Sequence, residues 1–114
     1  MPKINPQINP GIFREYDIRG IVDKDLSEEI VEAIAKAYGT YLSNHGKKIV
    51  SVGRDCRESS PSYSAVFCRA LNSCGIDVID LGMVSTPMVY FSLFNLEVEG
   101  GAMITASHNP SEYN

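Results

Sequence analysis

Residues 105–110, Thr-Ala-Ser-His-Asn-Pro, have the clearest chemical potential in this sequence. Asn109 and Pro110 predict a turn directly after Ser107 and His108. Such a turn lifts a serine hydroxyl out of a sheet and can direct backbone N–H groups towards an anion. Serine becomes an effective nucleophile only with a base, a lowered pKa or a metal. A Ser-His pair more often marks an exposed turn than a catalytic dyad, so these residue types do not by themselves establish catalysis.

Four arginines form a second group that could do chemistry, because each falls at an expected strand end or loop. The planar guanidinium group matches phosphate oxygens with two parallel hydrogen bonds. The spacing somewhat favours an alternative, in which the arginines form local ion pairs with acidic residues close in sequence. The arginines are Arg14, Arg19, Arg54 and Arg57, and their acidic neighbours are Glu15, Asp17, Asp55 and Glu58.

Several other kinds of site find no support in the sequence. It contains neither the GxGxxG motif of dinucleotide-binding proteins nor the GxxxxGK[ST] loop of nucleotide hydrolases. The two histidines and three cysteines lack the spacing of zinc ligands, and the GxSxG elbow of hydrolases is absent. We therefore expect none of these chemistries.

Composition and charge narrow the class of protein. The 114 residues correspond to about one domain, and 44% apolar with 21% charged residues is ordinary for a globular chain. No apolar run approaches the roughly 20 residues of a membrane span, and the N-terminus does not read as a signal peptide. A net charge of -4 argues against binding to nucleic acid or an anionic membrane, although clustered arginines could still bind a small anion. Three cysteines without a CxxC pair favour reduced thiols and a cytoplasmic location.

The elements that must position these residues begin with three expected helices. Residues 27–44 have the helical period, with Ser27 as the expected N-cap. Residues 61–74 predict a second helix with Ser60 as its cap. A third, shorter helix is expected over residues 88–95. The apolar stripe of the first helix consists of Ile30, Ile34, Tyr38, Tyr41 and Leu42.

Three short apolar runs, residues 49–52, 76–81 and 102–105, have the length of strands. None alternates cleanly between apolar and polar residues, which predicts strands that are covered on both faces. Strands alternating with helices indicate an α/β domain, a three-layer sandwich with helices on both faces of a mostly parallel (mixed) sheet. Residues 12–22 are a further strand candidate, suited to a sheet edge. Ligands bind at the carboxyl ends of strands in such sheets, so the polar segments that follow the strands are the expected site.

Four motifs, taken in order, resemble those of the α-D-phosphohexomutases. Residues 105–110 are identical to the family's active-site serine signature. Residues 13–20, Phe-Arg-Glu-Tyr-Asp-Ile-Arg-Gly, resemble the N-terminal signature of its phosphomannomutase/phosphoglucomutase branch. Residues 53–57 resemble its G-R-D-x-R loop, and residues 85–87 its S-T-P turn. The phosphoglucosamine mutase branch is the less favoured alternative, because it usually has F-G-T-D-G-I-R-G at the first motif.

The resemblance implies a phosphoryl relay at Ser107. In the family the matching serine is phosphorylated, gives its phosphoryl group to a hexose 1- or 6-phosphate, and regains one from the bisphosphorylated intermediate. Arg19 and His108 match supporting groups in charge stabilisation or proton transfer, and Tyr16 and Asn109 match positions that bind substrate or phosphate. Mg²⁺ would contact the phosphate on Ser107. The resemblance leaves open whether mannose or glucose is preferred.

Length separates this chain from the family, whose enzymes have four domains and are several times longer. We expect residues 1–11 to be an extended N-terminal segment, and residues 12–114 to be the first of the four domains, incomplete at its C-terminus. The chain alone should then lack the remaining Mg²⁺ ligands and the substrate clamp, and so should be inactive. One alternative is a non-catalytic α/β module that binds phosphorylated ligands through its arginines. A serine hydrolase is less favoured, because no acidic partner for His108 stands at a recognisable spacing.

Overall fold

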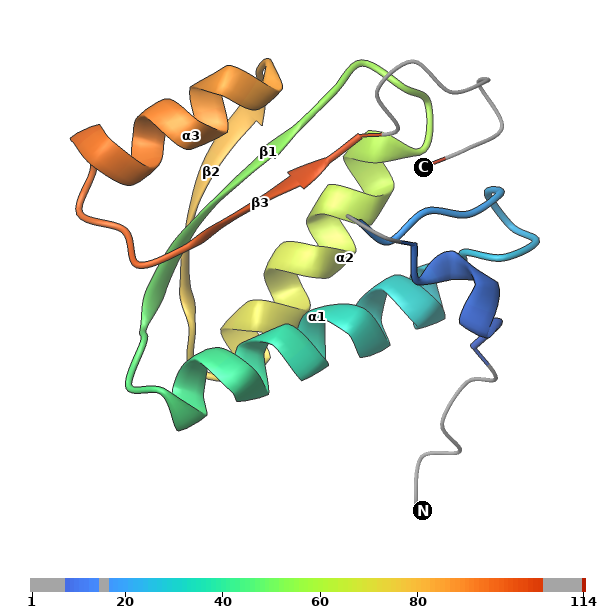
Figure 1. Ribbon diagram of the computed structural model, residues 1–114, viewed down its shortest axis with the longest axis horizontal. Coiled ribbons are helices and arrows are strands. Elements are labelled where there is room, and N and C mark those ends of the chain that lie inside the picture. Colours follow the sequence, from blue (N-terminus) through green and yellow to red (C-terminus); the bar gives the residue numbers. More distant parts are fainter. Residues whose placement is uncertain (1–7, 15–16, 106–113) are drawn as a thin grey trace.

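This computed structural model describes residues 8–14, 17–105 and 114 of the chain. They contain three parallel strands and three α-helices (Figure 1). The three predicted helices and the three main predicted strands are all confirmed, with ends that shift by one or two residues. In chain order the elements are the 3₁₀ turn η1 (Pro10–Ile12), α1 (Glu28–Asn44), β1 (Ile49–Arg54), α2 (Ser60–Ser73), β2 (Asp77–Met83), α3 (Thr86–Asn95) and β3 (Gly101–Ile104).

The strand order β2-β1-β3 places β1 at the centre of the sheet. β1 pairs in parallel with both neighbours, in registers that include Ile49↔Asp77 and Ser51↔Gly101. Parallel neighbours require crossover connections. The crossover from β1 to β2 and the crossover from β2 past β1 to β3 run in opposite directions, so right-handed connections carry α2 and α3 to opposite faces. Figure 1 shows α3 on one side of the sheet, and α1 and α2 on the other. The predicted three-layer α/β fold is therefore confirmed.

The central strand β1 shows why its sequence lacks a polar face. Val50 and Val52 are fully buried in the core that they share with α1 and α2. Ser51 faces the opposite side, where its hydroxyl oxygen lies 2.7 Å from that of Ser92 in α3. At Gly53 a Cβ atom would come within 2.9 Å of the Val89 side chain of α3. Both faces of β1 are covered, as the lack of a clean alternation between apolar and polar residues predicts.

Two expectations about strands are wrong. β2 and β3 are the edge strands of the described sheet, and their residues are exposed or half-buried, whereas strands covered on both faces were expected. The described part of this candidate, residues 12–14 and 17–22, forms no strand, only the isolated bridges Phe13↔Ile18 and Val22↔Leu26. The reason is local: the Arg14 N–H donates to the Asp17 carbonyl at 2.9 Å, so this segment bonds to itself and not to a strand of the sheet.

The pairing of α1 and α2 forms the second layer of the fold. Ser27 caps α1 as predicted, because its hydroxyl accepts a hydrogen bond from the Ile30 N–H at 3.2 Å. The helices approach so closely that a Cβ atom at Gly39 would lie 2.8 Å from that of Cys74. Tyr41 is a correction: it is 59% exposed, so it does not belong to the buried stripe.

The predicted cap of α2 is also wrong. Ser60 is the first residue of α2, and Ser59 occupies the N-cap position without a side-chain capping bond. The Ser60 hydroxyl donates instead to Asp55, a carboxylate that follows β1. The Ser60 side chain, which the local sequence predicts to cap α2, therefore makes a tertiary contact instead. Among the described residues, no helix has the length and apolar character needed to cross a membrane.

Candidate functional site

The carboxyl ends of β1 and β3 lie at the same edge of the sheet, because the two strands are parallel. Arg54 is paired with Ile104 in the register, and the Asp55 N–H donates to the Ile104 carbonyl at 3.0 Å. Thr105 follows directly. The polar residues after β1 therefore lie beside the start of the segment that carries Ser107, as the predicted topology requires.

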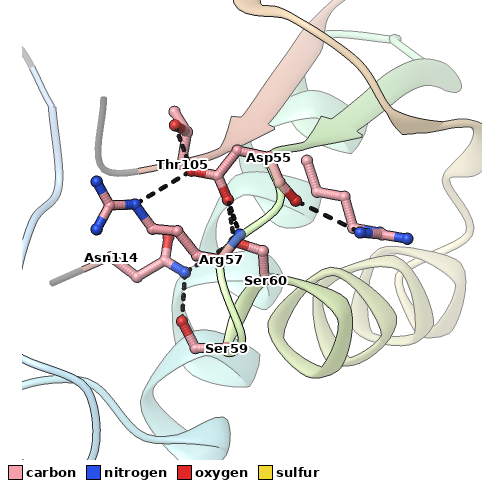
Figure 2. A network of polar contacts seen from close by, with 7 residues as sticks. Asp55, Arg57, Ser59, Ser60, Thr105 and Asn114 are labelled. Carbon is pink, nitrogen blue, oxygen red and sulfur yellow. Dashed lines mark hydrogen bonds and ion pairs between the residues drawn. The ribbon is translucent and has the colours of Figure 1, made fainter. Parts of the chain in front are cut away.

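Asp55 is the centre of the polar contacts at this edge (Figure 2). Its Oδ2 accepts a hydrogen bond from the Thr105 hydroxyl at 2.8 Å and lies 3.3 Å from Nε of Arg57. Its Oδ1 accepts from the Arg57 N–H at 3.1 Å and from the Ser60 hydroxyl at 2.5 Å. The Asp55 side chain is 19% exposed, which strengthens these contacts relative to a fully solvated pair. One carboxylate thus joins the end of β3 to the start of α2.

Asn114 joins the same network from the other side of the segment. Its side-chain Nδ2 donates to the hydroxyl oxygens of Ser59 at 2.6 Å and Ser60 at 3.0 Å. Its backbone N–H and carbonyl pair with the carbonyl and N–H of Gly20, at 2.9 and 3.0 Å. Asn114 is buried. These bonds bring Gly20, and therefore Arg19 beside it, to the edge where Thr105 and Asp55 lie.

The arginines behave largely as the local ion-pair alternative predicts. Nη2 of Arg19 lies 2.7 Å from Oδ2 of Asp17, and Arg57 pairs with Asp55. Arg14 donates instead to the Gly11 carbonyl, at 2.8 Å. An ion pair does not remove a guanidinium from a phosphate site, because its five N–H groups can serve more than one acceptor. It does fix the direction in which the guanidinium points.

Arg19 is the predicted site residue whose position the structure describes, and its side chain is 25% exposed. The other four predicted residues lie outside the described residues, so their placement stays a prediction. They are Ser107, His108, Asn109 and Tyr16. Thr105 and Asn114, which bound residues 106–113, are both described and both belong to the Asp55 network.

An open cavity of about 840 Å³ lies along α1 and β3. Its wall is mostly apolar, but it also includes Asp17, Arg19, Thr105 and Asn114. The volume is in the range of small-molecule sites, which commonly combine apolar walls with a few polar groups. The cavity therefore extends to Thr105 and Asn114, two of the residues in the polar network around Asp55. Within the described part of the chain, no group of three or more His, Cys, Asp or Glu residues could hold a metal ion.

Asp25 connects residues on both sides of Arg19 in the sequence, Asn9 and Ile21. Its carboxylate accepts hydrogen bonds from the Asn9 side chain at 3.0 Å and from the Ile21 N–H at 3.2 Å. These two hydrogen bonds lower the pKa of Asp25, the Asn9 bond most of all. Gly20 makes room for this contact, because a Cβ atom there would lie 2.7 Å from that of Asp25.

The lowered pKa of Asp25 predicts a pH effect on stability. A carboxyl group with a lower pKa in the folded state stabilises the protein above its unfolded pKa, and this contribution is lost as the pH falls through the folded value. We expect Asp25→Asn to lose less stability than the wild type between about pH 5 and about pH 3 in urea unfolding. Asp77→Asn, at an exposed aspartate in β2, is the matched control. Equal losses in wild type and Asp25→Asn would contradict the assignment.

Sequence reasoning missed Asn114, Ser59 and Ser60 as part of this site. Ser60 and Asn114 are 54 positions apart, so no local spacing could pair them. Asp55 belongs to the G-R-D-x-R resemblance, and this was the available signal for the centre of the network.

Comparison with known proteins gives consistent matches over almost the whole chain. The sequence profile described as phosphoglucomutase/phosphomannomutase, alpha/beta/alpha domain I, matches residues 10–114. A phosphomannomutase of Salmonella typhimurium is 43% identical over 102 residues, covering 90% of this chain and 22% of the relative. A phosphomannomutase/phosphoglucomutase of Pseudomonas aeruginosa is 42% identical over 109 residues, covering 96% and 24%.

A solved structure agrees with these matches. The crystal structure of a phosphoglucomutase/phosphomannomutase family protein from Burkholderia thailandensis superposes with a TM-score of 0.88 at 36% identity. The match covers 95% of this chain and 25% of that one. This chain therefore spans about a quarter of the length of the relatives that it matches. Fold, domain profile and sequence identity agree that the chain belongs to the phosphoglucomutase/phosphomannomutase family.

Proposed function

We propose that this chain is the phosphoserine-bearing domain of a phosphosugar mutase, with Ser107 as the relay. The enzyme interconverts hexose 6-phosphate and hexose 1-phosphate, of mannose or glucose, through a bisphosphorylated sugar. One observation supports this most: Thr105 and Asn114, on either side of the Ser107 segment, are hydrogen-bonded into one network beside Arg19. On this proposal, a phosphate on Ser107 lies near the guanidinium of Arg19, which is paired with Asp17. The substrate class follows from the names of the relatives.

The reaction consists of two transfers in opposite directions. In the first, a sugar hydroxyl oxygen bonds to the phosphorus on Ser107 and gives up its proton, while the bond from that phosphorus to Ser107 Oγ breaks and Ser107 Oγ takes up a proton. In the second, Ser107 Oγ gives up its proton and bonds to the phosphorus at the other end of the sugar, while the bond from that phosphorus to the sugar oxygen breaks and that oxygen takes up a proton. Such transfers depend chiefly on positioning and on stabilising the charge of the transferring oxygens.

On this proposal the supporting residues handle charge and protons. Arg19 stabilises the negative oxygens, with its guanidinium directed by the 2.7 Å contact to Asp17. His108 assists in charge stabilisation or proton transfer, and Tyr16 and Asn109 bind substrate or phosphate. Mg²⁺ on a phosphate oxygen of Ser107 supplies further charge neutralisation when bound. That phosphate is the one ligand for Mg²⁺ that we assign to this chain.

The free cysteines support a cytoplasmic location, which we propose with the same enzyme. Cys56 is exposed, whereas Cys68 and Cys74 are half-buried, and all three are free thiols. Burial raises the pKa of the Cys68 thiol, which lowers its reactivity. A reducing compartment is the ordinary environment of a chain with an exposed, unpaired thiol.

The 114-residue chain alone is expected to give no mutase turnover. We assign the substrate clamp and the remaining Mg²⁺ ligands to regions beyond the matched quarter of the relatives. Conversion of mannose 6-phosphate to mannose 1-phosphate, followed by phosphorus NMR with the full-length enzyme as positive control, measures this. Steady turnover by the chain alone would contradict the division of the site between domains.

Phosphate on Ser107 tests the proposal directly. We expect peptide mass spectrometry of the full-length enzyme to find a phosphoryl group on Ser107, and the sugar monophosphate to remove it as the bisphosphorylated sugar forms. A non-catalytic module would bind phosphorylated ligands without being phosphorylated itself. Turnover by an enzyme that never carries phosphate at Ser107 would overturn the proposal.

A further inference from the structure

Both ends of residues 106–113 are tied to one carboxylate. On one side, the Thr105 hydroxyl donates directly to Oδ2 of Asp55 at 2.8 Å. On the other, Nδ2 of Asn114 donates to the Ser60 hydroxyl oxygen at 3.0 Å, and that hydroxyl donates to Oδ1 of Asp55 (Figure 2). The two connections end on different oxygens of the same side chain.

We propose that Asp55 is a positioning residue that fixes the two ends of the Ser107 segment relative to each other. The part that concerns phosphoryl transfer rests on the proposed function, whereas the part that concerns the two ends rests on the contacts alone. Asp55 touches neither the sugar nor the transferring phosphoryl group in this account. It acts through Thr105, Ser60 and Asn114.

The chemistry of the contacts requires a carboxylate at this position. An ionised carboxylate is purely an acceptor, with room for about four hydrogen bonds, and both hydroxyl groups that face Asp55 act as donors. An asparagine has the same shape but replaces one acceptor oxygen with an NH₂ donor, which would oppose a hydroxyl or an N–H. Charge-assisted hydrogen bonds are also about twice as strong as neutral ones.

Ser60 transmits the effect of Asp55 to the far end of the segment. Ser60 is fully buried, and its one hydroxyl proton points to Asp55, so its oxygen lone pairs are turned towards Nδ2 of Asn114. Loss of the acceptor at Asp55 would free the Ser60 hydroxyl to rotate and would weaken the bond to Asn114. Buried polar groups that lose a partner are costly, so the two ends of the segment are coupled.

A backbone amide reports the state of the far end. The Gly20 N–H donates to the Asn114 carbonyl at 3.0 Å, so its hydrogen exchange measures how often Asn114 leaves the network. In the 114-residue chain we expect Asp55→Asn to speed exchange at Gly20 by about 10- to 100-fold, with Ser60→Ala giving a similar increase. Exchange in the β1 amides, which follows global opening, provides the normalisation.

Asp80→Asn is the matched control. Asp80 is an exposed aspartate in the edge strand β2, and it accepts a hydrogen bond from the Gly82 N–H at 2.8 Å. It should leave Gly20 exchange within about twofold of the wild type. Unchanged Gly20 exchange in Asp55→Asn, or an increase no larger than that of the β1 amides, would overturn the proposal. This result is independent of any activity at Ser107.

Kinetics of the full-length enzyme test the consequence for transfer. A displacement of about 1 Å can cost about 100-fold in rate, so Asp55→Asn and Thr105→Val should lower kcat at least tenfold with KM within about twofold. Thr105→Ser retains the hydroxyl and should restore most of kcat. A rise in KM with unchanged kcat, or a Thr105→Ser variant as slow as Thr105→Val, would overturn the positioning role. If Ser107→Ala stays active, the proposed function fails, and Gly20 exchange still decides whether Asp55 holds the segment.

Discussion

Replacing Ser107 with alanine is expected to lower kcat of the full-length enzyme by roughly 10³-fold or more. On the proposed relay, alanine has no oxygen that could carry the phosphoryl group between the two ends of the sugar, so both transfers should be blocked. Binding of the sugar phosphate should change much less, because the hydroxyl contributes little contact area. Initial rates with mannose 6-phosphate and with glucose 6-phosphate measure the effect, and titration of the variant with substrate separates binding from turnover.

The matched control for Ser107→Ala is Ser111→Ala, a serine four positions later in the same segment. It should keep activity within a few-fold of the wild type and should still carry phosphate on Ser107. Equal losses in both variants would indicate that the segment tolerates no change, and would remove the special role of Ser107. Full activity in Ser107→Ala would end the relay hypothesis.

Truncating Leu71 to alanine is expected to produce the largest loss of stability among conservative changes in the core. Leu71 is fully buried in α2, and its side chain faces Gly39 of α1 across the close contact between the two helices. Removing a fully buried leucine side chain costs about 2–5 kcal/mol of unfolding free energy, and a small domain has only about 5–15 kcal/mol in total. Urea unfolding, followed by circular dichroism, measures the change.

Leu96→Ala provides the control for Leu71→Ala, because the substitution is the same but Leu96 is 42% exposed. Its cost should stay below about 1 kcal/mol, since most of the removed surface already meets water. A difference between the two variants of less than about 1 kcal/mol would show that the α1–α2 interface adjusts to the cavity. The role given to Leu71 in joining the helices would then be wrong.

The regular elements could be predicted because their signals are local. Apolar residues at helical spacing, with Ser27 at the start of α1, define that helix within one residue. Gly46 and Gly75 follow α1 and α2 with φ angles of +71° and +81°, a conformation that favours glycine and ends each helix. The three strands follow from short apolar runs between the helices. The strand predicted over residues 12–22 was wrong, because strand propensity does not take account of the local hydrogen bond between Arg14 and Asp17.

The candidate site, like the fold, could be predicted from the sequence only in part. Topology alone predicted that the polar residues after β1 and β3 meet, because parallel strands end at one edge. The partners of Ser60 could not be predicted, since its hydroxyl satisfies Asp55 and Asn114 from distant parts of the chain. A serine before an apolar helix favours a cap in isolation, and only the assembled fold offers it a carboxylate instead. The sequence therefore predicted that the site lies at the carboxyl ends of β1 and β3. Which side chains contact one another there depends on the tertiary structure.

The strand order β2-β1-β3 also has a consequence for how the molecule assembles. None of the three described strands is paired through a hairpin. The pairing of β1 with β3 joins Ser51 to Gly101 across an entire helix–strand–helix unit. Closing loops of this length slows folding relative to forming local helices. The contacts of Asn114 with Ser59 and Ser60 depend on that closure, so folding intermediates can contain native helices before the contacts around Asp55 have formed.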